Sequence, residues 1–280
     1  MSDLTVLLEG LTFAEGPRWH QEKLWFSDFY ANEVVTVDEN GRRDTIVTVP
    51  QQPSGLGWLP DDTLLIVSMR DQKLLRFSDN QLEEYADLSA HSNYWCNDMV
   101  VDAQGYAFVG NFGFNRHANE KPKSTTLVCV TPSGETSIAA RDLWFPNGTV
   151  ITPDGSTLIV AETRAKRLTA FDIGEDGILS NRRIFAETDN MYPDGICLDK
   201  EGAVWVADPQ NKEVIRIKAG GEITEKIDLG NRGAYACMLG GADGRTLFIC
   251  TNTGSGPEIA NQKSGKIETV QVAIPKAGRP

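Results

Sequence analysis

The chain has 280 residues and a formal net charge of −12, from 39 acidic and 27 basic residues. This length allows one large all-β domain or two ordinary domains, and we expect a single domain over residues 1–280. The acidic balance, without a Lys/Arg cluster, argues against nucleic acid and against anionic membranes as partners. No apolar run approaches the ~20 residues of a membrane span.

The chain contains five cysteines, an odd number, and none of them form a C-x-x-C pair. This pattern favours reduced thiols and argues against a cysteine-based zinc site. The first residues lack the basic and apolar segments of a signal peptide. Together these features predict a cytoplasmic protein.

Six similar units follow one another along the chain. Each starts with a polar residue or a turn and continues with an apolar stretch, a Pro/Asp/Gly turn and a hydrophobic strand. When the units are anchored at positions 15, 55, 97, 147, 194 and 237, the steps are 40, 42, 50, 47 and 43 residues. A period of ~40–50 residues with several short strands per unit is typical of a β-propeller. Taken in chain order, the paired strand motifs occupy residues 15–28, 54–67, 97–109, 147–160, 194–208 and 236–250.

Further strand-like segments complete each unit. In the first unit they occupy residues 34–38 and 45–49, so one unit supplies four strands. We therefore expect an all-β, six-bladed propeller with four-stranded blades. Residues 4–8 are predicted to close the ring as the outer strand of the last blade, beside residues 266–272. Pairing the two ends of the chain in this way removes open sheet edges.

Four oxygen-bearing side chains stand at the start of four of these units: Glu15, Asn97, Asn147 and Asp194. The innermost strands of a propeller run along its central tunnel, so residues at their start converge at one mouth of it. Two carboxylates and two amides suit a hard cation such as Ca²⁺, Mg²⁺ or Mn²⁺, and suit Zn²⁺ or Fe²⁺ less well. The four residues are therefore predicted to hold one divalent metal ion.

Each of these residues also has an ordinary alternative. Asn-Gly and Asp-Gly pairs are frequent in turns because glycine supplies the positive φ that such turns need. The shared position of all four in the repeat favours the metal site. Trp95 and Trp144 flank this position and are candidates for a substrate-binding wall, with packing as the alternative. His117, in the long insert of the third unit, is a substrate-binding candidate, with a loop role as the alternative.

At these residues the chain resembles the senescence-marker-protein / gluconolactonase / luciferin-regenerating-enzyme family, over almost its whole length. The motifs that carry the resemblance are Glu15-Gly16-Pro17-x-Trp19, Asn97-Asp98, Asn147-Gly148, Pro193-Asp194-Gly195 and Gly240-Gly241-x-Asp243. The family consists of six-bladed propellers with a divalent metal in the tunnel. The resemblance implies that Glu15, Asn147 and Asp194 ligate the metal, with Ca²⁺ as the first choice, and that Asn97 contacts metal or substrate. It also implies that Asp194 is the catalytic base.

The resemblance implies a metal-dependent hydrolase that opens a lactone ring in a small-molecule lactone or ester. The sugar lactonases often carry Arg-Phe before Asn-Asp, where this chain has Trp95-Cys96. An indole offers apolar surface in place of the hydrogen-bonding fork of a guanidinium, which favours a less polar lactone. Two alternatives are a phosphotriesterase-like hydrolase and a non-catalytic, metal-binding or regulatory propeller.

Overall fold

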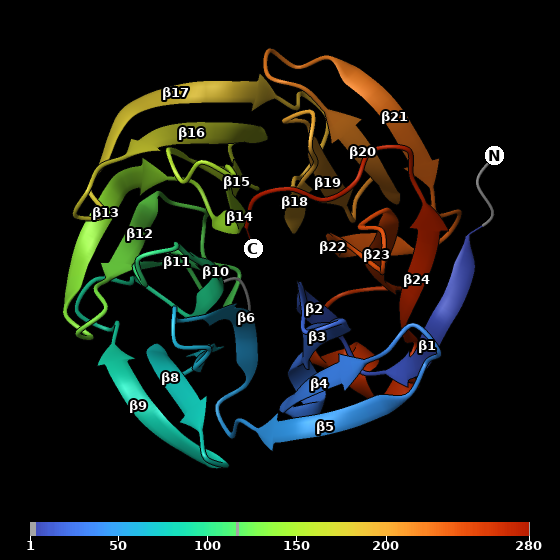
Figure 1. Cartoon of the computed structure of the whole chain (residues 1–280), viewed down its shortest axis with the longest axis horizontal. Coiled ribbons are helices and arrows are strands. Elements are labelled where there is room, and N and C mark those ends of the chain that lie inside the picture. Colours follow the sequence, from blue (N-terminus) through green and yellow to red (C-terminus); the bar gives the residue numbers. More distant parts are fainter. Residues whose placement is uncertain (1–3, 116–117, 280) are drawn as a thin grey trace.

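The computed structural model describes residues 4–115 and 118–279. In this part of the chain the strands form six four-stranded antiparallel sheets, arranged as blades around a central axis (Figure 1). Blade 1 contains β2 (Ala14–His20), β3 (Lys23–Asp28), β4 (Glu33–Val37) and β5 (Arg43–Thr48). Blade 2 contains β6 (Pro53–Trp58), β7 (Leu64–Ser68), β8 (Lys73–Ser78) and β9 (Gln81–Asp87). Blade 3 contains β10 (Cys96–Val101), β11 (Ala107–Asn111), β12 (Thr125–Val130) and β13 (Thr136–Leu143).

The second half of the ring repeats this order. Blade 4 contains β14 (Pro146–Ile151), β15 (Thr157–Glu162), β16 (Arg167–Ile173) and β17 (Leu179–Glu187). Blade 5 contains β18 (Ile196–Leu198), β19 (Val204–Asp208), β20 (Glu213–Ile217) and β21 (Ile223–Asp228). Blade 6 contains β22 (Gly233–Gly240), β23 (Thr246–Asn252), β24 (Gly265–Gln271) and β1 (Thr5–Leu11).

The predicted six-bladed propeller is thus confirmed, including its closure by the N-terminal strand. β1 pairs with β24, with Thr5 opposite Thr269. Two short 3-10 helices, η1 (Phe29–Ala31) and η3 (Pro257–Gln262), lie in the connections of blades 1 and 6. None of the helices in the described part of the chain is long and apolar enough to cross a membrane.

Burial falls from the centre of each blade to its rim. The inner strands β10, β14 and β22 are buried at every position, because their two faces pack against the neighbouring blades. The outer strand β5 is instead largely exposed. Ring contacts join adjacent blades, such as Trp19 stacked on Phe248 with 5.2 Å between ring centroids. The hydrophobic core therefore lies between the blades, and it holds the inner strands firmly around the tunnel.

The inner strands approach one another so closely that glycine is required. A Cβ atom on Gly148 would lie 2.5 Å from the backbone nitrogen of Ile196 and 2.7 Å from the backbone oxygen of Asp194. The backbone N–H of Gly148 donates to that Asp194 oxygen at 3.2 Å. The glycine in Asn147-Gly148 thus serves contact between blades 4 and 5, and it brings the preceding side chain toward the tunnel.

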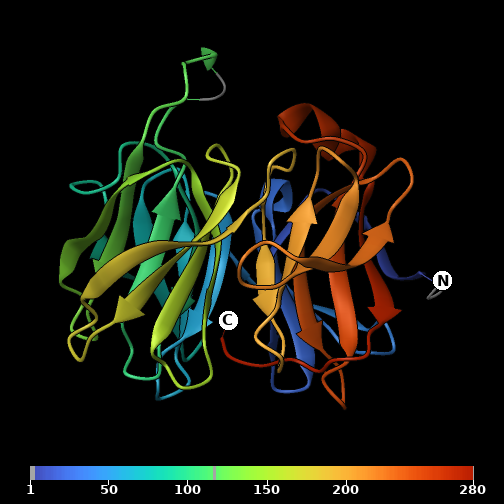
Figure 2. The ribbon, with the colours of Figure 1, turned by 90° about the horizontal axis from the view of Figure 1, so that it is seen from above.

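The segment after β24 crosses the tunnel at the end opposite η3 (Figure 2). It is held by backbone hydrogen bonds to inner strands of several blades. The N–H of Ala277 donates to Leu198 at 3.0 Å, and Arg279 and Ile151 exchange two bonds of 2.8 and 2.9 Å. One end of the tunnel is therefore covered by main chain from residues 272–279, which joins blades 4 and 5.

Candidate functional site

The structure brings the four residues at the starts of the inner strands together at one end of the tunnel. Glu15, Asn97 and Asn147 are the second residues of β2, β10 and β14, and Asp194 lies two residues before β18. In blades 1, 3 and 4 the pairing with the next strand is irregular just after this position. Such bulges change the direction of a side chain relative to the regular ladder. Repeat geometry and a repeated bulge therefore converge these side chains.

A cavity of about 470 Å³ opens above these residues. All four predicted metal ligands belong to its lining. The remaining lining residues were missed from the sequence: Phe13, Phe29, Phe112, Phe145, Thr163, Arg164, Tyr192, Pro209, Gln210, Tyr235 and Ser255. Most of them lie in connections between strands, where no periodicity marks them. Tyr235 is an exception. It lies in blade 6 at the position of the repeat that Asp194 occupies in blade 5, so an alignment of the repeats could have identified it as a lining residue.

Hydrogen bonds link three of the four floor residues. Asn147 donates through Nδ2 to Asp194 Oδ1 at 2.5 Å and to Thr163 Oγ1 at 3.2 Å. Asn97 donates through Nδ2 to Asn147 Oδ1 at 3.0 Å. The Thr163 hydroxyl donates to the backbone oxygen of Pro193 at 2.7 Å, which holds the segment that carries Asp194. Asn147 thus contacts the Asp194 carboxylate directly, and Thr163 holds the backbone next to it.

The floor is electrostatically unfavourable for two negative charges. Burial raises the pKa of Glu15 well above its ordinary value of 4.5, and the charges of Asp194 and Asp98 raise it further. The backbone N–H of Gly16, which donates to Glu15 Oε2 at 3.1 Å, and the charge of Arg18 act in the opposite direction. A divalent cation between the carboxylates would offset this repulsion.

The donor set fits such an ion. In residues 4–115 and 118–279 there is no group of three or more His, Cys, Asp or Glu side chains arranged for a metal. Beside the carboxylates of Glu15 and Asp194, the side chains of Asn97 and Asn147 offer amide oxygens to the same cavity. Two carboxylates and two amides are the hard oxygen ligands that Ca²⁺ and Mg²⁺ prefer.

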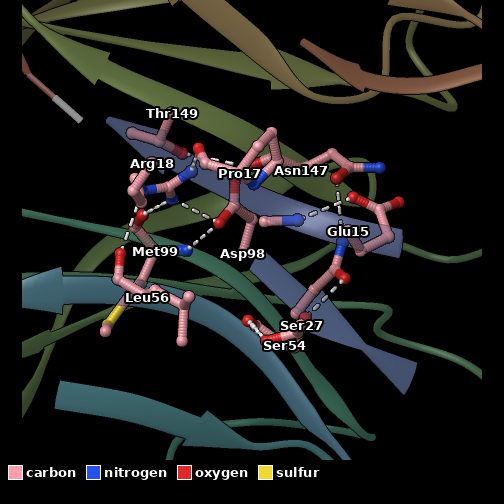
Figure 3. Close-up of polar contacts among 12 residues, drawn as sticks. Glu15, Pro17, Arg18, Ser27, Ser54, Leu56, Asp98, Met99, Asn147 and Thr149 are labelled. Atoms are coloured by element: carbon pink, nitrogen blue, oxygen red, sulfur yellow. Dashed lines mark hydrogen bonds and ion pairs between the residues drawn. The ribbon is translucent and has the colours of Figure 1, made fainter. Parts of the chain in front are cut away.

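Next to the floor residues on the inner strands β2 and β10 is a buried ion pair that the sequence did not reveal. Arg18 is 3% exposed, and its Nη2 lies 2.6 Å from Asp98 Oδ1 (Figure 3). The same guanidinium donates to the backbone oxygens of Pro17, Leu56 and Met99 at 2.6–2.9 Å. Asp98 is thus a structural partner of Arg18. In the sequence, the available signal was a pair of oppositely charged residues, 80 positions apart, each within a segment predicted to be an inner strand.

The three substrate-binding candidates predicted from the sequence differ in their position relative to the cavity. Trp95 does not line this cavity but a second one of about 270 Å³ beside it, and it stacks on Tyr94 with 5.2 Å between centroids. Trp144 is 38% exposed and lines neither cavity. His117 lies outside the described residues. Of the three, Trp95 is the one that the structure places next to the candidate site.

Known proteins resemble this chain over nearly its full length. Residues 13–253 match the model of the SMP-30/Gluconolactonase/LRE-like region. The 6-deoxy-6-sulfogluconolactonase of Pseudomonas putida is 27% identical and covers 98% of this chain and 96% of its own length. A pentonolactonase of Haloferax volcanii is 25% identical and covers 95% and 92%. A solved luciferin-regenerating enzyme shares the fold, with a TM-score of 0.85 at 17% identity over 99% of this chain and 98% of its own. The family match spans most of the sequence, so this chain belongs to the SMP-30/gluconolactonase/LRE-like family.

Proposed function

We propose that this chain is a divalent-metal-dependent hydrolase that opens the ring of a small-molecule lactone. The observation that carries the proposal is the placement of Glu15, Asn97, Asn147 and Asp194 on one cavity floor in a member of this family. Support comes from the two curated relatives named as lactonases, which align over nearly their full length.

Glu15, Asn147 and Asp194 would hold the metal ion, with Asn97 beside it. Ca²⁺ is the first choice for these oxygen ligands, followed by Mg²⁺ and Mn²⁺, with Zn²⁺ and Fe²⁺ as further options. A bound cation would supply Lewis acidity, polarising the lactone carbonyl and stabilising the negative charge on its oxygen.

Asp194 is the proposed general base. Asn147 holds its Oδ1 atom, so the carboxylate keeps one orientation at the cavity surface. In the reaction, water adds to the carbonyl carbon and gives a proton to Asp194, and the ring C–O bond then breaks. The departing ring oxygen takes up this proton, which yields a hydroxy acid and restores the carboxylate.

Aromatic side chains form part of the cavity wall beside the polar floor. Phe13, Phe145 and Tyr235 are buried and surround the polar floor. Phe13 meets Tyr235 edge to face with 4.6 Å between ring centroids. Apolar walls lower the local dielectric constant, so charges on the adjoining floor interact more strongly than they would in bulk water.

Metal analysis combined with a lactone panel tests the proposal. Purified protein is assayed for metal content, stripped with a chelator, and reloaded with Ca²⁺, Mg²⁺, Mn²⁺ or Zn²⁺. Lactone hydrolysis is followed with a pH indicator, with a phosphotriester as the competing substrate class. We expect one ion per chain and hydrolysis only in its presence. Equal turnover in chelator, or turnover of the phosphotriester alone, would contradict the proposal.

Glu15→Gln examines the ligand assignment. The variant keeps the side-chain shape but removes one negative charge, so metal affinity should fall at least about 10-fold while the melting temperature of the metal-free protein is kept. Glu22→Gln, at an exposed position outside the cavity, is the matched control. Wild-type metal affinity in Glu15→Gln would show that the ligand set is wrong.

A further inference from the structure

The cavity above the polar floor has a second, more apolar cavity beside it. The second cavity, of about 270 Å³, shares four lining residues with the first, so the two spaces have common walls. The shared residues are Phe13, Phe29, Phe112 and Ser255. We call the second cavity the apolar compartment. Its further lining residues are Tyr30, Gln52, Met69, Arg70, Trp95, Gly256 and Pro257.

The walls of the apolar compartment are packed aromatic and aliphatic side chains. Phe13, Phe29, Met69 and Phe112 belong to one buried cluster, and Met69 is only 1% exposed. Phe13 and Phe29 are 5.5 Å apart between ring centroids. Trp95 packs against this cluster from blade 3. The walls of the compartment therefore come from blades 1, 2 and 3, and residues 255–257 of blade 6 complete its lining.

The charged side chain of the compartment is already engaged within the protein. Arg70 Nε donates to Gln52 Oε1 at 2.7 Å, and the guanidinium lies over the Trp95 ring, 5.2 Å from its centroid. A guanidinium bound in this way offers fewer donors to a ligand hydroxyl. The compartment thus favours apolar substituents, whereas the adjoining floor is built from oxygen-bearing groups.

We infer that the apolar compartment is a specificity subsite that takes an alkyl or aromatic substituent of the substrate, while the lactone ring lies over the polar floor. This inference rests on the proposed function and names its substrate class: lactones with an apolar side chain. The shared walls of the two cavities carry it, because a ligand over Asp194 has the compartment as its neighbouring space.

A homologous series of γ-lactones measures the effect. Each methylene that enters the compartment should raise kcat/KM about fourfold, since its burial is favourable by roughly the transfer free energy of one CH₂ group. The series runs from γ-butyrolactone to γ-nonalactone, with glucono-1,5-lactone as the polar reference. We expect a stepwise rise in the wild type that levels off when the compartment is full.

Trp95→Ala removes one wall of the compartment without touching the floor. We expect kcat/KM for the longest lactone to fall about 10-fold or more, and that for glucono-1,5-lactone to stay within about twofold. Met69→Gln is a second variant, which keeps the side-chain length and places an amide in the apolar wall. Tyr85→Ala, on the outer strand β9, is the control for truncation of an aromatic residue outside both cavities.

The outcomes separate the two proposals. A flat series in an enzyme that does hydrolyse lactones would overturn the subsite alone. Equal losses on the apolar and polar lactones in both Trp95→Ala and Met69→Gln, beyond those in Tyr85→Ala, would also overturn it. No hydrolysis of any lactone by the metal-loaded protein would overturn the proposed function and, with it, the subsite.

Discussion

The two ends of the central tunnel are built from the same six inner strands, yet they differ in charge and in cover. At one end Glu15 and Asp194 place carboxylates on the floor of an open cavity. At the other, Lys276 and Arg279 of the crossing C-terminal segment line a different cavity. The repeat explains why side chains converge at both ends. The two ends differ because the side chains at equivalent positions differ, and because residues 272–279, which are not part of the repeat, cover one end. The uncovered, acidic end is the one suited to metal binding and hydrolysis.

The largest effect is expected at the acidic end, from Asp194→Asn. An amide cannot accept the proton of the attacking water, so hydrolysis by the metal-loaded variant should fall ~10²–10⁴-fold. The melting temperature should remain close to that of the wild type. Asp228→Asn, on the outer strand of the same blade, is the matched control. Turnover near the wild-type rate, with metal bound, would eliminate Asp194 as the base.

The second effect concerns the ion pair between the two ends. Arg18→Met should lower the free energy of unfolding by about 3–5 kcal/mol, because Asp98 would be left buried without its charged partner. Arg43→Met, which breaks the more exposed pair with Glu33, should cost at most about 1 kcal/mol. Denaturant unfolding of both variants measures the difference. Equal losses would mean that the buried pair stabilises the fold no more than the exposed one does.

The smallest effect is expected at the basic end. Burial lowers the pKa of Lys276 from its ordinary value of 10.5, so the folded state binds this proton less tightly than the unfolded state does. The charged lysine therefore destabilises the folded state at neutral pH. This destabilisation decreases as the pH rises toward 10.5, because the folded state loses the proton before the unfolded state does. Lys276→Met should therefore raise the free energy of unfolding at pH 7 by at most about 1 kcal/mol.

The same variant should also change the pH dependence. Its advantage over the wild type should shrink as the pH approaches 10.5, where the lysine loses its charge in both states. Thermal unfolding at several pH values, with Lys200→Met as the control, follows this trend. A constant difference across the pH range would place the effect in packing instead of charge.

The sequence was most informative where the chain repeats. The shared phase of Glu15, Asn97, Asn147 and Asp194 predicted that they would converge, because equivalent positions in a ring of blades face one axis. The phase did not show that Asp98 pairs with Arg18, since that contact depends on how two inner strands are offset across the tunnel. A sequence repeat shows which positions are equivalent, but it does not show which side chains from different repeats contact one another.

Irregular segments were the least predictable. The sequence did not decide between a wall of the site and packing for Trp95; in the structure it lines the second cavity and not the one above the floor, a placement that depends on loop conformation. The crossing of residues 272–279 escaped prediction altogether, since the segment has no strand periodicity and is held mainly by main-chain bonds. The metal and the substrate contacts stay predictions until they are measured.

The pairing of β1 with β24 affects the order in which the blades fold. Thr5 and Thr269 are partners, so the last blade is incomplete until β24 has been synthesised. Closing so long a loop is entropically costly and slow, and blade 6 meanwhile exposes an unpaired strand edge. We therefore expect this blade to be the last to mature during refolding. Hydrogen-exchange labelling should find the amides of β24 protected later than those of β11 or β15.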